Sequence, residues 1–476
     1  MAPTESAALT LDHLRRYVTG GHMGSLHPLG GEPEWRRPIA AAANDSRDLV
    51  PDGLFVALPG ERTDGHRFVP AAYAAGAAVL LVARPPDGDL VATPGRDDTL
   101  PPALIWQVDD PLAALQGLAA WWRARFDLPV VGITGSVGKT TAKAVLTSAL
   151  DAAALPALAS PRSFNNEIGL PLTLLSLANR HRAAVLEMGI YDVGDIAFLA
   201  RIARQTIGVV LNVEAVHLER AGSIERIARA KAELITTLPR GGTAVLNHDD
   251  PRVRAMAEAA PGPVSTFGLE AGADWQGLDL QALPDGLALT IAHRSGRHKV
   301  RSRLPGRHHA AALLAAAAVM ETLGVPIPRI VAALEAVPVP ASRQRLLRRA
   351  DGGLLIDDTY NASPLSMLAA LDLLAEQDAP RRVAILADML ELGPLAEQAH
   401  RQVGARAAEV VDLLLAVGPL SRHAAEAASG CAIWFEDKAA LRTALPTLLR
   451  KGDAMLVKGS RGMAMEDVVG WLCDAG

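Results

Sequence analysis

Short apolar runs and amphipathic segments alternate along the middle of this 476-residue chain. The apolar runs have the length of buried strands, and the segments between them repeat their apolar positions at helical spacing. The strand-like runs are VVGIT (130–134), AAVLEMG (183–189), IGVVLNV (207–213) and TAVLNHDD (243–250). Regular alternation of this kind predicts a mostly parallel sheet with helices on both faces. Polar alternation over 274–303 indicates a small antiparallel insert.

Similar patterns flank this middle region. LFVAL (54–58) and AAVLLVA (77–83) predict strands before it, and four further runs after 350 predict a Rossmann-like sheet. A linker rich in proline, glycine and aspartate (85–102) and the proline-rich 337–342 are typical of exposed connections. We therefore predict an α/β fold with a small N-terminal domain, a central domain and a C-terminal Rossmann-like domain. The predicted bounds are 1–103, 104–336 and 337–476.

Composition narrows the class of protein. Half of the residues are apolar and 4% are aromatic, which favours aliphatic cores and excludes a disordered chain. The formal net charge of −5 gives no support to binding nucleic acid through its phosphates. Two cysteines without a Cys-x-x-Cys motif exclude a zinc knuckle or a disulfide framework. Because we find neither a signal-peptide pattern nor a stretch long enough for a membrane span, we expect a cytoplasmic protein.

A glycine-rich loop between a predicted strand and a predicted helix is the most informative segment. Its residues are Gly132, Ile133, Thr134, Gly135, Ser136, Val137, Gly138, Lys139, Thr140 and Thr141. Glycines let backbone N–H groups turn toward phosphate oxygens, the lysine adds a positive charge, and the Thr140 hydroxyl can ligate Mg²⁺. Ile133 stands where the usual phosphate loop has glycine, so this loop is a variant. The alternative is an ordinary glycine-rich turn, and the flanking strand and helix argue against it.

Other polar residues lie near predicted strand ends, where open parallel sheets bind their ligands. Glu187 and His217 could reach a metal bound with a nucleotide, and Lys231 lies on a nearby helix. The three also have plain interpretations as a solvated glutamate, a structural histidine and a charged helix face. Polar residues of the predicted C-terminal domain could line the second side of a cleft, although each of them alone is typical of a helix cap or a turn. These residues are Asp358, Asn361, Asp388, Glu391, Lys458 and Arg461.

The order of several motifs resembles the Mur ligase family of peptidoglycan synthesis. These motifs are GITGSVGKTT, FNNEIGLPLT, VLEMG, NVEAVHLE, AKAEL, GRHHAA, DDTYNASPLSM, LADMLELG and VKGSRGMAME. The resemblance runs from DSR at 45 to MEDVV near the end of the chain. The Asp-Asn-Pro-Arg motif, typical of the ligase that adds the third residue of the stem peptide, is absent from the sequence.

The resemblance implies an ATP-dependent amide ligase that joins D-Ala-D-Ala to UDP-MurNAc-tripeptide through an acyl phosphate. It also implies two Mg²⁺ ions and a monomeric enzyme. Lys139 and Thr140 would hold the ATP phosphates and one magnesium, Glu187 and His217 would serve magnesium, and Lys231 would be carbamylated. Residues of the first and last domains, with two asparagines of the central one, would hold the remaining substrate groups. For the UDP part these are Ser46, Arg47, Asp64 and His66; for the muramyl peptide, Asn165 and Asn166; for the nucleotide, His309, Arg343 and Asp358; for the dipeptide side, Tyr360, Asn361 and Ser363, with Lys458 and Arg461.

The chain departs from the family pattern in places. His309 and Ala312 replace two asparagines of the usual adenine contact, Ser342 precedes Arg343 where glycine is common, and Ala387 precedes Asp388 likewise. Three other interpretations stay open at this point. They are another Mur or folylpolyglutamate-type ligase, a phosphate-loop NTPase that is not a ligase, and an inactive UDP-sugar binder.

Overall fold

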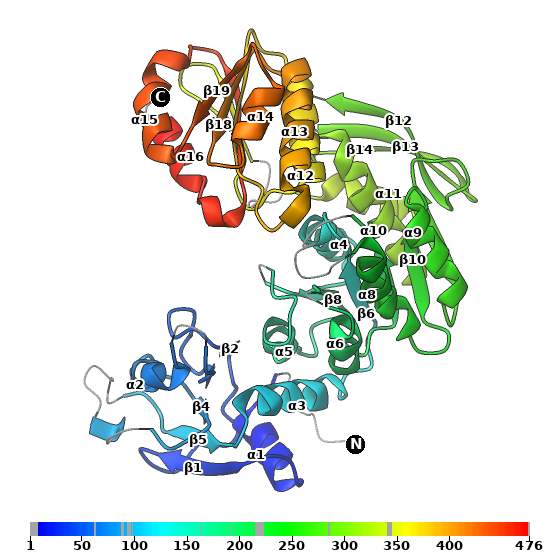
Figure 1. The fold of residues 1–476 in the computed structure, drawn as a ribbon. Coiled ribbons are helices and arrows are strands. Elements are labelled where there is room, and N and C mark those ends of the chain that lie inside the picture. Colours follow the sequence, from blue (N-terminus) through cyan, green and yellow to red (C-terminus); the bar gives the residue numbers. More distant parts are fainter. Residues whose placement is uncertain are drawn as a thin grey trace.

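The computed structural model describes residues 8–60, 63–86, 90–92, 97, 99–161, 163–190, 192–214, 223–283, 286–339 and 345–474. Across these residues the strands form three separate sheets, one after another along the chain. Figure 1 shows an open, C-shaped molecule in which the central sheet joins the N-terminal and C-terminal ones. No helix in these ranges is long and apolar enough to cross a membrane. The predicted α/β class is confirmed.

The first sheet has the strand order β1-β5-β4-β3-β2 and is parallel except where β1 meets β5. Its elements are α1 (Leu11–Thr19), β1 (Ser25–Leu29), β2 (Ala42–Ala43), β3 (Leu54–Val56), α2 (Val69–Ala74), β4 (Val79–Val82) and β5 (Ala103–Gln107). Strands β3 and β4 carry the two predicted apolar runs and are fully buried. Because β5 pairs with β1 and β4, this sheet extends past the predicted boundary at 103 to Gln107.

The central sheet has the order β14-β13-β12-β11-β10-β9-β6-β8-β7. Its strands are β6 (Val130–Thr134), β7 (Ala157–Ala159), β8 (Ala183–Glu187), β9 (Ile207–Val210), β10 (Thr243–Asn247), β11 (Val264–Gly268), β12 (Trp275–Leu283), β13 (Gly286–His293) and β14 (Gly296–Ser302). Its helices are α3 (Pro111–Arg123), α4 (Lys139–Ala152), α5 (Gly169–Leu174), α6 (Asp195–Ala203), α8 (Ile224–Thr236), α9 (Pro251–Ala255), α10 (Ala310–Thr322) and α11 (Ile327–Ala336). The predicted antiparallel insert is present as β12–β14, and it continues the parallel sheet at its edge.

Helix α3 joins the first sheet to the central domain. Asp110 caps its N-terminus by accepting from the backbone N–H groups of Leu112 and Ala113, and Pro111 supplies the first helical residue. The helix packs against α5 and α6 of the central domain and also contacts β3 and α1 of the first. Its buried Leu118 and Trp122 belong to an apolar core that both parts share. This shared core holds the N-terminal part against the central one.

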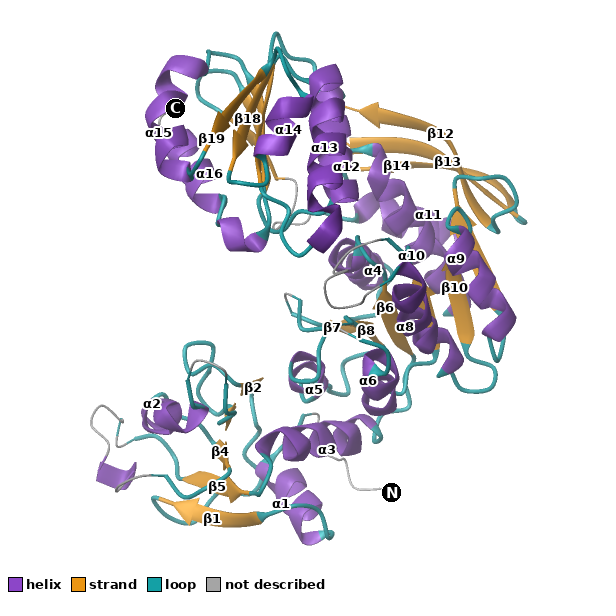
Figure 2. Cartoon of the chain, in the orientation of Figure 1, coloured by secondary structure: helices purple, strands orange, loops and turns teal. Residues whose placement is uncertain are grey.

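The third sheet has the order β15-β16-β20-β17-β18-β19, parallel except at its β15 edge. Its strands are β15 (Arg345–Arg348), β16 (Leu354–Asp358), β17 (Arg382–Ala387), β18 (Leu413–Val417), β19 (Ala432–Phe435) and β20 (Ala454–Lys458). Its helices are α12 (Pro364–Ala375), α13 (Ala396–Val410), α14 (Arg422–Ala427), α15 (Lys438–Leu448) and α16 (Glu466–Asp474). Figure 2 shows helices on both sides of this sheet, as two separate apolar cores require.

Candidate active site

The phosphate-binding loop lies between β6 and α4, as the sequence predicts. Gly138 has a φ of 85°, a left-handed conformation that favours glycine, and Lys139 opens the helix behind it. Asn212 fastens the loop by accepting from the Val137 backbone N–H at 2.9 Å and donating to the Val137 carbonyl at 3.1 Å. The Lys139 ammonium donates to the Gly135 carbonyl at 2.6 Å. The loop is therefore held in shape, with a helix N-terminus and an ammonium at one place.

Glu187, the last residue of β8, is fixed from several sides. Its side chain is buried, and its two carboxylate oxygens accept from Asn165 Nδ2 at 2.9 Å and Thr140 Oγ1 at 3.0 Å. The ammonium of the buried Lys143 lies 3.5 Å from Glu187 Oε2 and donates to the Ser160 carbonyl at 2.7 Å. The Ser160 hydroxyl in turn accepts from the Glu187 backbone N–H at 3.3 Å. These contacts set the direction of the Glu187 carboxylate beside the phosphate-binding loop.

Lys231 on α8 is a buried lysine. It is 2% exposed, and no hydrogen bond or ion pair joins its side chain to the residues that the structure describes. Burial, reinforced by the charge of Lys139, holds the pKa of its amine well below the usual range. The side chain lines a cavity of about 170 Å³ together with Lys139, Asn165 and Asn166. An amine with a lowered pKa therefore lines this cavity.

A larger cleft of about 660 Å³ lies between the central and C-terminal domains. The central wall carries the phosphate-binding loop, Glu187, Asn247 and the start of α10, including His309 and Ala312. The opposite wall comes from three loops after strands of the C-terminal sheet. That wall includes Asp358, Tyr360, Asn361, Ser363, Glu391, Lys458, Ser460 and Arg461. Lys139 and Asn165 line both cavities, so the two spaces meet at the loop.

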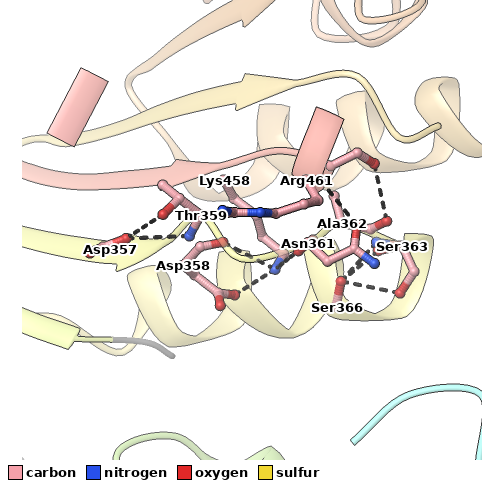
Figure 3. Close-up of polar contacts among 10 residues, drawn as sticks. Asp357, Asp358, Thr359, Asn361, Ala362, Ser363, Ser366, Lys458 and Arg461 are labelled. Carbon is pink, nitrogen blue, oxygen red and sulfur yellow. Dashed lines mark hydrogen bonds and ion pairs between the residues drawn. The ribbon is translucent and has the colours of Figure 1, made fainter. Parts of the chain in front are cut away.

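The C-terminal wall is organised around a buried ion pair (Figure 3). Asp358 and Lys458 end the neighbouring strands β16 and β20 in register, and Lys458 Nζ lies 2.6 Å from Asp358 Oδ2. The same ammonium donates to the Asn361 carbonyl at 2.8 Å, which ties the following loop to the pair. Asn361 Oδ1 then accepts from the backbone N–H of Arg461 at 3.3 Å. The charges of this wall are therefore largely neutralised within it.

His309 is buried where α10 begins. Its Nδ1 lies 2.6 Å from the carbonyl oxygen of Pro305, and burial lowers the pKa of the imidazole to about 3. Ala312, one turn further along α10, lines the cleft without a polar group. The two positions where the family pattern has asparagine thus hold a neutral imidazole, that of His309, and the methyl group of Ala312.

Comparison with known proteins agrees with this geometry. Three family models match in order along the chain: Mur ligase family, catalytic domain (39–120), Mur ligase middle domain (133–320) and Mur ligase, glutamate ligase domain (342–461). The UDP-N-acetylmuramoyl-tripeptide–D-alanyl-D-alanine ligase of Escherichia coli (strain K12) is 38% identical over 436 residues, which cover 90% of this chain and 93% of the relative. The chain belongs to the Mur ligase family.

Two solved structures of family members share this three-domain arrangement. MurF from Acinetobacter baumannii superposes with a TM-score of 0.84 at 31% sequence identity, covering 98% of this chain and 99% of that one. MurF from Thermotoga maritima, solved in complex with ADP, gives a TM-score of 0.77 at 28% identity and covers 91% of this chain and 97% of that one. The predicted membership of the Mur ligase family is confirmed.

Most of the predicted Mur ligase site residues line one of the two cavities, and the rest do not. On the cleft are Ser136, Val137, Gly138, Lys139, Thr140, Thr141, Asn165, Glu187, His309, Asp358, Tyr360, Asn361, Ser363, Lys458 and Arg461. On the smaller cavity are Gly135, Asn166 and Lys231. Gly132, Ile133 and Thr134 are buried in β6 behind the loop. His217 and Arg343 lie outside the described residues, so their roles stay predictions.

The four predicted residues of the N-terminal domain line neither cavity: Ser46 and Arg47 lie in a turn, and Asp64 caps the short 3-10 helix (Gly65–Phe68) that contains His66. Arg47 is exposed and paired with Asp45, and Ser46 lies between them. The His66 ring contacts Asp64 at 2.9 Å through Nδ1, while its Nε2 accepts from the Ala83 backbone N–H at 2.9 Å. An ion pair with Arg84 is the main reason that the pKa of the Asp64 carboxyl falls below its usual range. These contacts build the loops, and a role in binding UDP stays a prediction.

Sequence reasoning missed some residues that shape the site. Lys143 and Ser160 fix Glu187, and the hydroxyl groups of Ser163 and Tyr360 meet across the boundary between the central and C-terminal domains. Lys143 follows Lys139 by one helical turn, and this spacing was the available signal. The contact between Ser163 and Tyr360 joins positions 197 residues apart, which no local pattern reveals.

Proposed function

We propose that this chain is an ATP-dependent ligase that joins D-Ala-D-Ala to UDP-MurNAc-tripeptide, giving UDP-MurNAc-pentapeptide, ADP and phosphate. The observation that carries the proposal is the meeting of two cavities at Lys139 and Asn165, one lined by the buried Lys231 and one facing the C-terminal domain. The relative from Escherichia coli carries the name of this activity. An acceptor substrate on one side and a nucleotide on the other would then meet at the phosphate-binding loop.

Amide formation in water requires an activated carboxylate, because a free carboxylate is a poor electrophile. In the proposed reaction, an oxygen of the tripeptide carboxylate bonds to the γ-phosphorus of ATP and the bond to ADP breaks. The amine of D-Ala-D-Ala then attacks the acyl carbon, phosphate leaves with the former carboxylate oxygen, and the nitrogen loses a proton. Phosphoryl transfer of this kind depends on positioning and charge neutralisation, which Lys139 and the N-terminus of α4 offer.

The residues present fit magnesium as well as ATP. Thr140 and Glu187 offer oxygen ligands at the loop, and we propose that His217 and a carbamylated Lys231 complete the set. The buried Lys231 amine, which has no partner among the described residues, supports this, because a carbamate would give it an anionic oxygen pair. Magnesium, when bound, would neutralise charge on the transferred phosphoryl group. Glu187 needs no rearrangement for this role, since Thr140, Asn165 and Lys143 already orient it.

The three parts of the chain divide the substrates in this proposal. The N-terminal domain (1–103) would hold UDP, the central domain (104–336) ATP, and the C-terminal domain (337–476) would close the cleft over the dipeptide. The contact between Ser163 and Tyr360 supports such closure, since it already joins the two walls. Closure would exclude water, which otherwise hydrolyses an acyl phosphate.

Phosphate release from ATP, measured with UDP-MurNAc-tripeptide and with or without D-Ala-D-Ala, tests the proposal. We expect sustained release only when all three substrates are present, together with a product heavier by the dipeptide. Lys139→Ala is the matched control, and it should lose turnover while its melting temperature stays near that of the wild type, because its ammonium faces the loop rather than a core. ATP hydrolysis that needs neither substrate would favour a phosphate-loop NTPase that is not a ligase.

A further inference from the structure

Helix α12 meets the segment before α10 beside the interdomain cleft. Figure 1 shows α12 where the C-terminal domain adjoins the central one. Ser366 and Ala369 of α12 line the cleft. One turn further along the same face, Leu373 packs against Gly306, where an added Cβ would lie 3.3 Å from Leu373 Cδ1. Glu376 directly follows α12 on this face, so the contact between Leu373 and Gly306 separates the cleft from Glu376.

Glu376 has a carboxylate oxygen that is buried without a partner. Its Oε2 is shielded from solvent and accepts no hydrogen bond from the residues that the structure describes. Burial raises the pKa of this carboxyl, and the positive charge of Arg307 on the facing domain opposes that rise. Buried polar atoms are rarely left unpaired, because an acceptor that has lost its water and gained no donor is unfavourable. A donor that reached Oε2 would therefore stabilise whichever arrangement of the domains brought it there.

Arg307 is the nearby cation on the central domain. It follows Gly306 directly, is exposed, and donates from Nη2 to the Leu280 carbonyl at 3.0 Å. That bond leaves most of its five N–H donors for other partners. No ion pair joins the guanidinium to Glu376 or to another carboxylate in the described part of the chain. The two groups are thus close enough for one charge to act on the other, but they do not touch.

We infer that Arg307 and Glu376 form an ion pair in a second arrangement of the two domains, and that this pair is a latch that holds the cleft wider until a nucleotide binds. The pair and the cleft lie on opposite sides of the contact between Leu373 and Gly306. Rotation about this contact that brings the pair together therefore widens the cleft. The ion pair would supply the donor that Glu376 Oε2 lacks. The part played by the nucleotide rests on the proposed function, whereas the ion pair does not.

Small-angle X-ray scattering of the full chain without nucleotide tests the latch. Glu376→Gln keeps the shape of the side chain and removes its charge, so it should give a smaller radius of gyration than the wild type. Arg307→Gln should do the same from the other domain. Exchanging the charges, Arg307→Glu with Glu376→Arg, should restore the radius of the wild type, because it rebuilds the pair. Arg303→Gln removes an exposed, unpaired arginine of the same region and is the matched control, which should change nothing.

Calorimetric binding of ADP measures what the latch costs the ligand. Glu376→Gln and Arg307→Gln should each bind ADP about threefold to tenfold tighter than the wild type, because a larger fraction of the molecules already has the narrower cleft. The charge exchange should return the affinity toward that of the wild type, and Arg303→Gln should leave it unchanged. Glu376 does not line the cleft, so its effect would not come from contact with the nucleotide.

Two results would overturn the inference: a radius of gyration that neither single variant changes, or a charge exchange that leaves the radius of the single variants unrestored. The melting temperature of each variant identifies chains that fail to fold, and the exposed Arg307→Gln keeps the test decisive if Glu376→Gln does not fold. Ligation is assayed separately on the wild type. The expected changes in radius in a chain that forms no amide would count against the proposed function and leave the latch standing.

Discussion

The central and C-terminal sides of the cleft differ in how their charged side chains are paired. On the central wall, the Lys139 ammonium lies at the phosphate-binding loop, and the buried Lys143 ammonium behind it lies 3.5 Å from Glu187 Oε2. The buried Lys231, in the adjoining smaller cavity, has no hydrogen-bond or ion-pair partner among the described residues. On the C-terminal wall, the Lys458 ammonium is satisfied by Asp358 and by the loop carbonyl of Asn361. The central side therefore has one buried amine, that of Lys231, without a partner among the described residues, whereas the C-terminal wall uses its charges to hold its own loops.

This difference indicates which residues we expect to contribute to substrate binding or turnover and which to the stability of the fold. A buried ion pair contributes little net stability, but breaking it leaves an uncompensated charge. We therefore expect a change at Lys231 to affect turnover first, and changes to the buried Lys143–Glu187 and Asp358–Lys458 pairs to affect folding as well. Substitutions at Lys231, Lys143 and Lys458 test this contrast, and a fourth, at His66, tests the proposed division of substrates among the domains.

Lys231 gives the largest expected effect. Lys231→Ala should lower turnover by about 100-fold or more, because removing one preorganised group from a phosphoryl-transfer site has costs of this size. A small acid such as formate should restore part of the activity by filling the vacated space with an anion. Lys231→Arg should stay poor, since a guanidinium keeps its charge and cannot be carbamylated. Wild-type turnover in Lys231→Arg would rule out the carbamate and return Lys231 to a structural role.

Lys143→Met removes the buried ammonium that orients Glu187. We expect a loss of about 3 kcal/mol in the free energy of unfolding, since a buried carboxylate loses its charged partner. We also expect weaker binding of Mg²⁺ with ADP, measured by calorimetry. Lys299→Met, at an exposed position on β14, is the control and should change neither quantity. Tight Mg²⁺ binding retained in a folded Lys143→Met protein would show that Glu187 is oriented without it.

Lys458→Met breaks the pair on the opposite wall. The expected result is a similar loss of about 3 kcal/mol in stability, and a second change, Asp358→Asn, should recover much of that loss by removing the unpaired charge. Unfolding midpoints of the two single variants and the double variant form the cycle that measures this coupling. Additive losses in the double variant would contradict a direct pair.

His66→Ala should have the smallest effect of the four. Because both ring nitrogens hold neighbouring groups of the loop, His66 would act on a bound UDP group through loop shape. The KM for UDP-MurNAc-tripeptide should rise by about threefold to tenfold, in line with losing one ordinary hydrogen bond. The KM for D-Ala-D-Ala should not change. An effect confined to the dipeptide would contradict the proposed division of substrates among the domains.

Much of the fold was predictable because most strands of the parallel sheets are continuous apolar runs. The N-terminal boundary was harder, since β5 follows the breaker-rich linker and then pairs back into the first sheet. In the site, the phosphate-binding loop could be predicted from its glycines between a strand and a helix, and Glu187 from its position at the end of a strand. Lys143 resembles any solvated lysine on an amphipathic helix, and the Asp358–Lys458 pair depends on the register of strands 100 residues apart. Such partners are set by tertiary packing, and the helical spacing of Lys139 and Lys143 alone does not identify the partner of Lys143.

Activation of a carboxylate at the meeting point of the two cavities is the central claim. It is tested most directly with UDP-MurNAc-tripeptide labelled with ¹⁸O in its terminal carboxylate, incubated with ATP and D-Ala-D-Ala, followed by mass spectrometry of the released phosphate. The account predicts that a labelled oxygen moves to phosphate with each amide bond formed. Phosphate released without label, beside unchanged tripeptide, would show that water rather than the carboxylate attacks ATP, and would contradict the account.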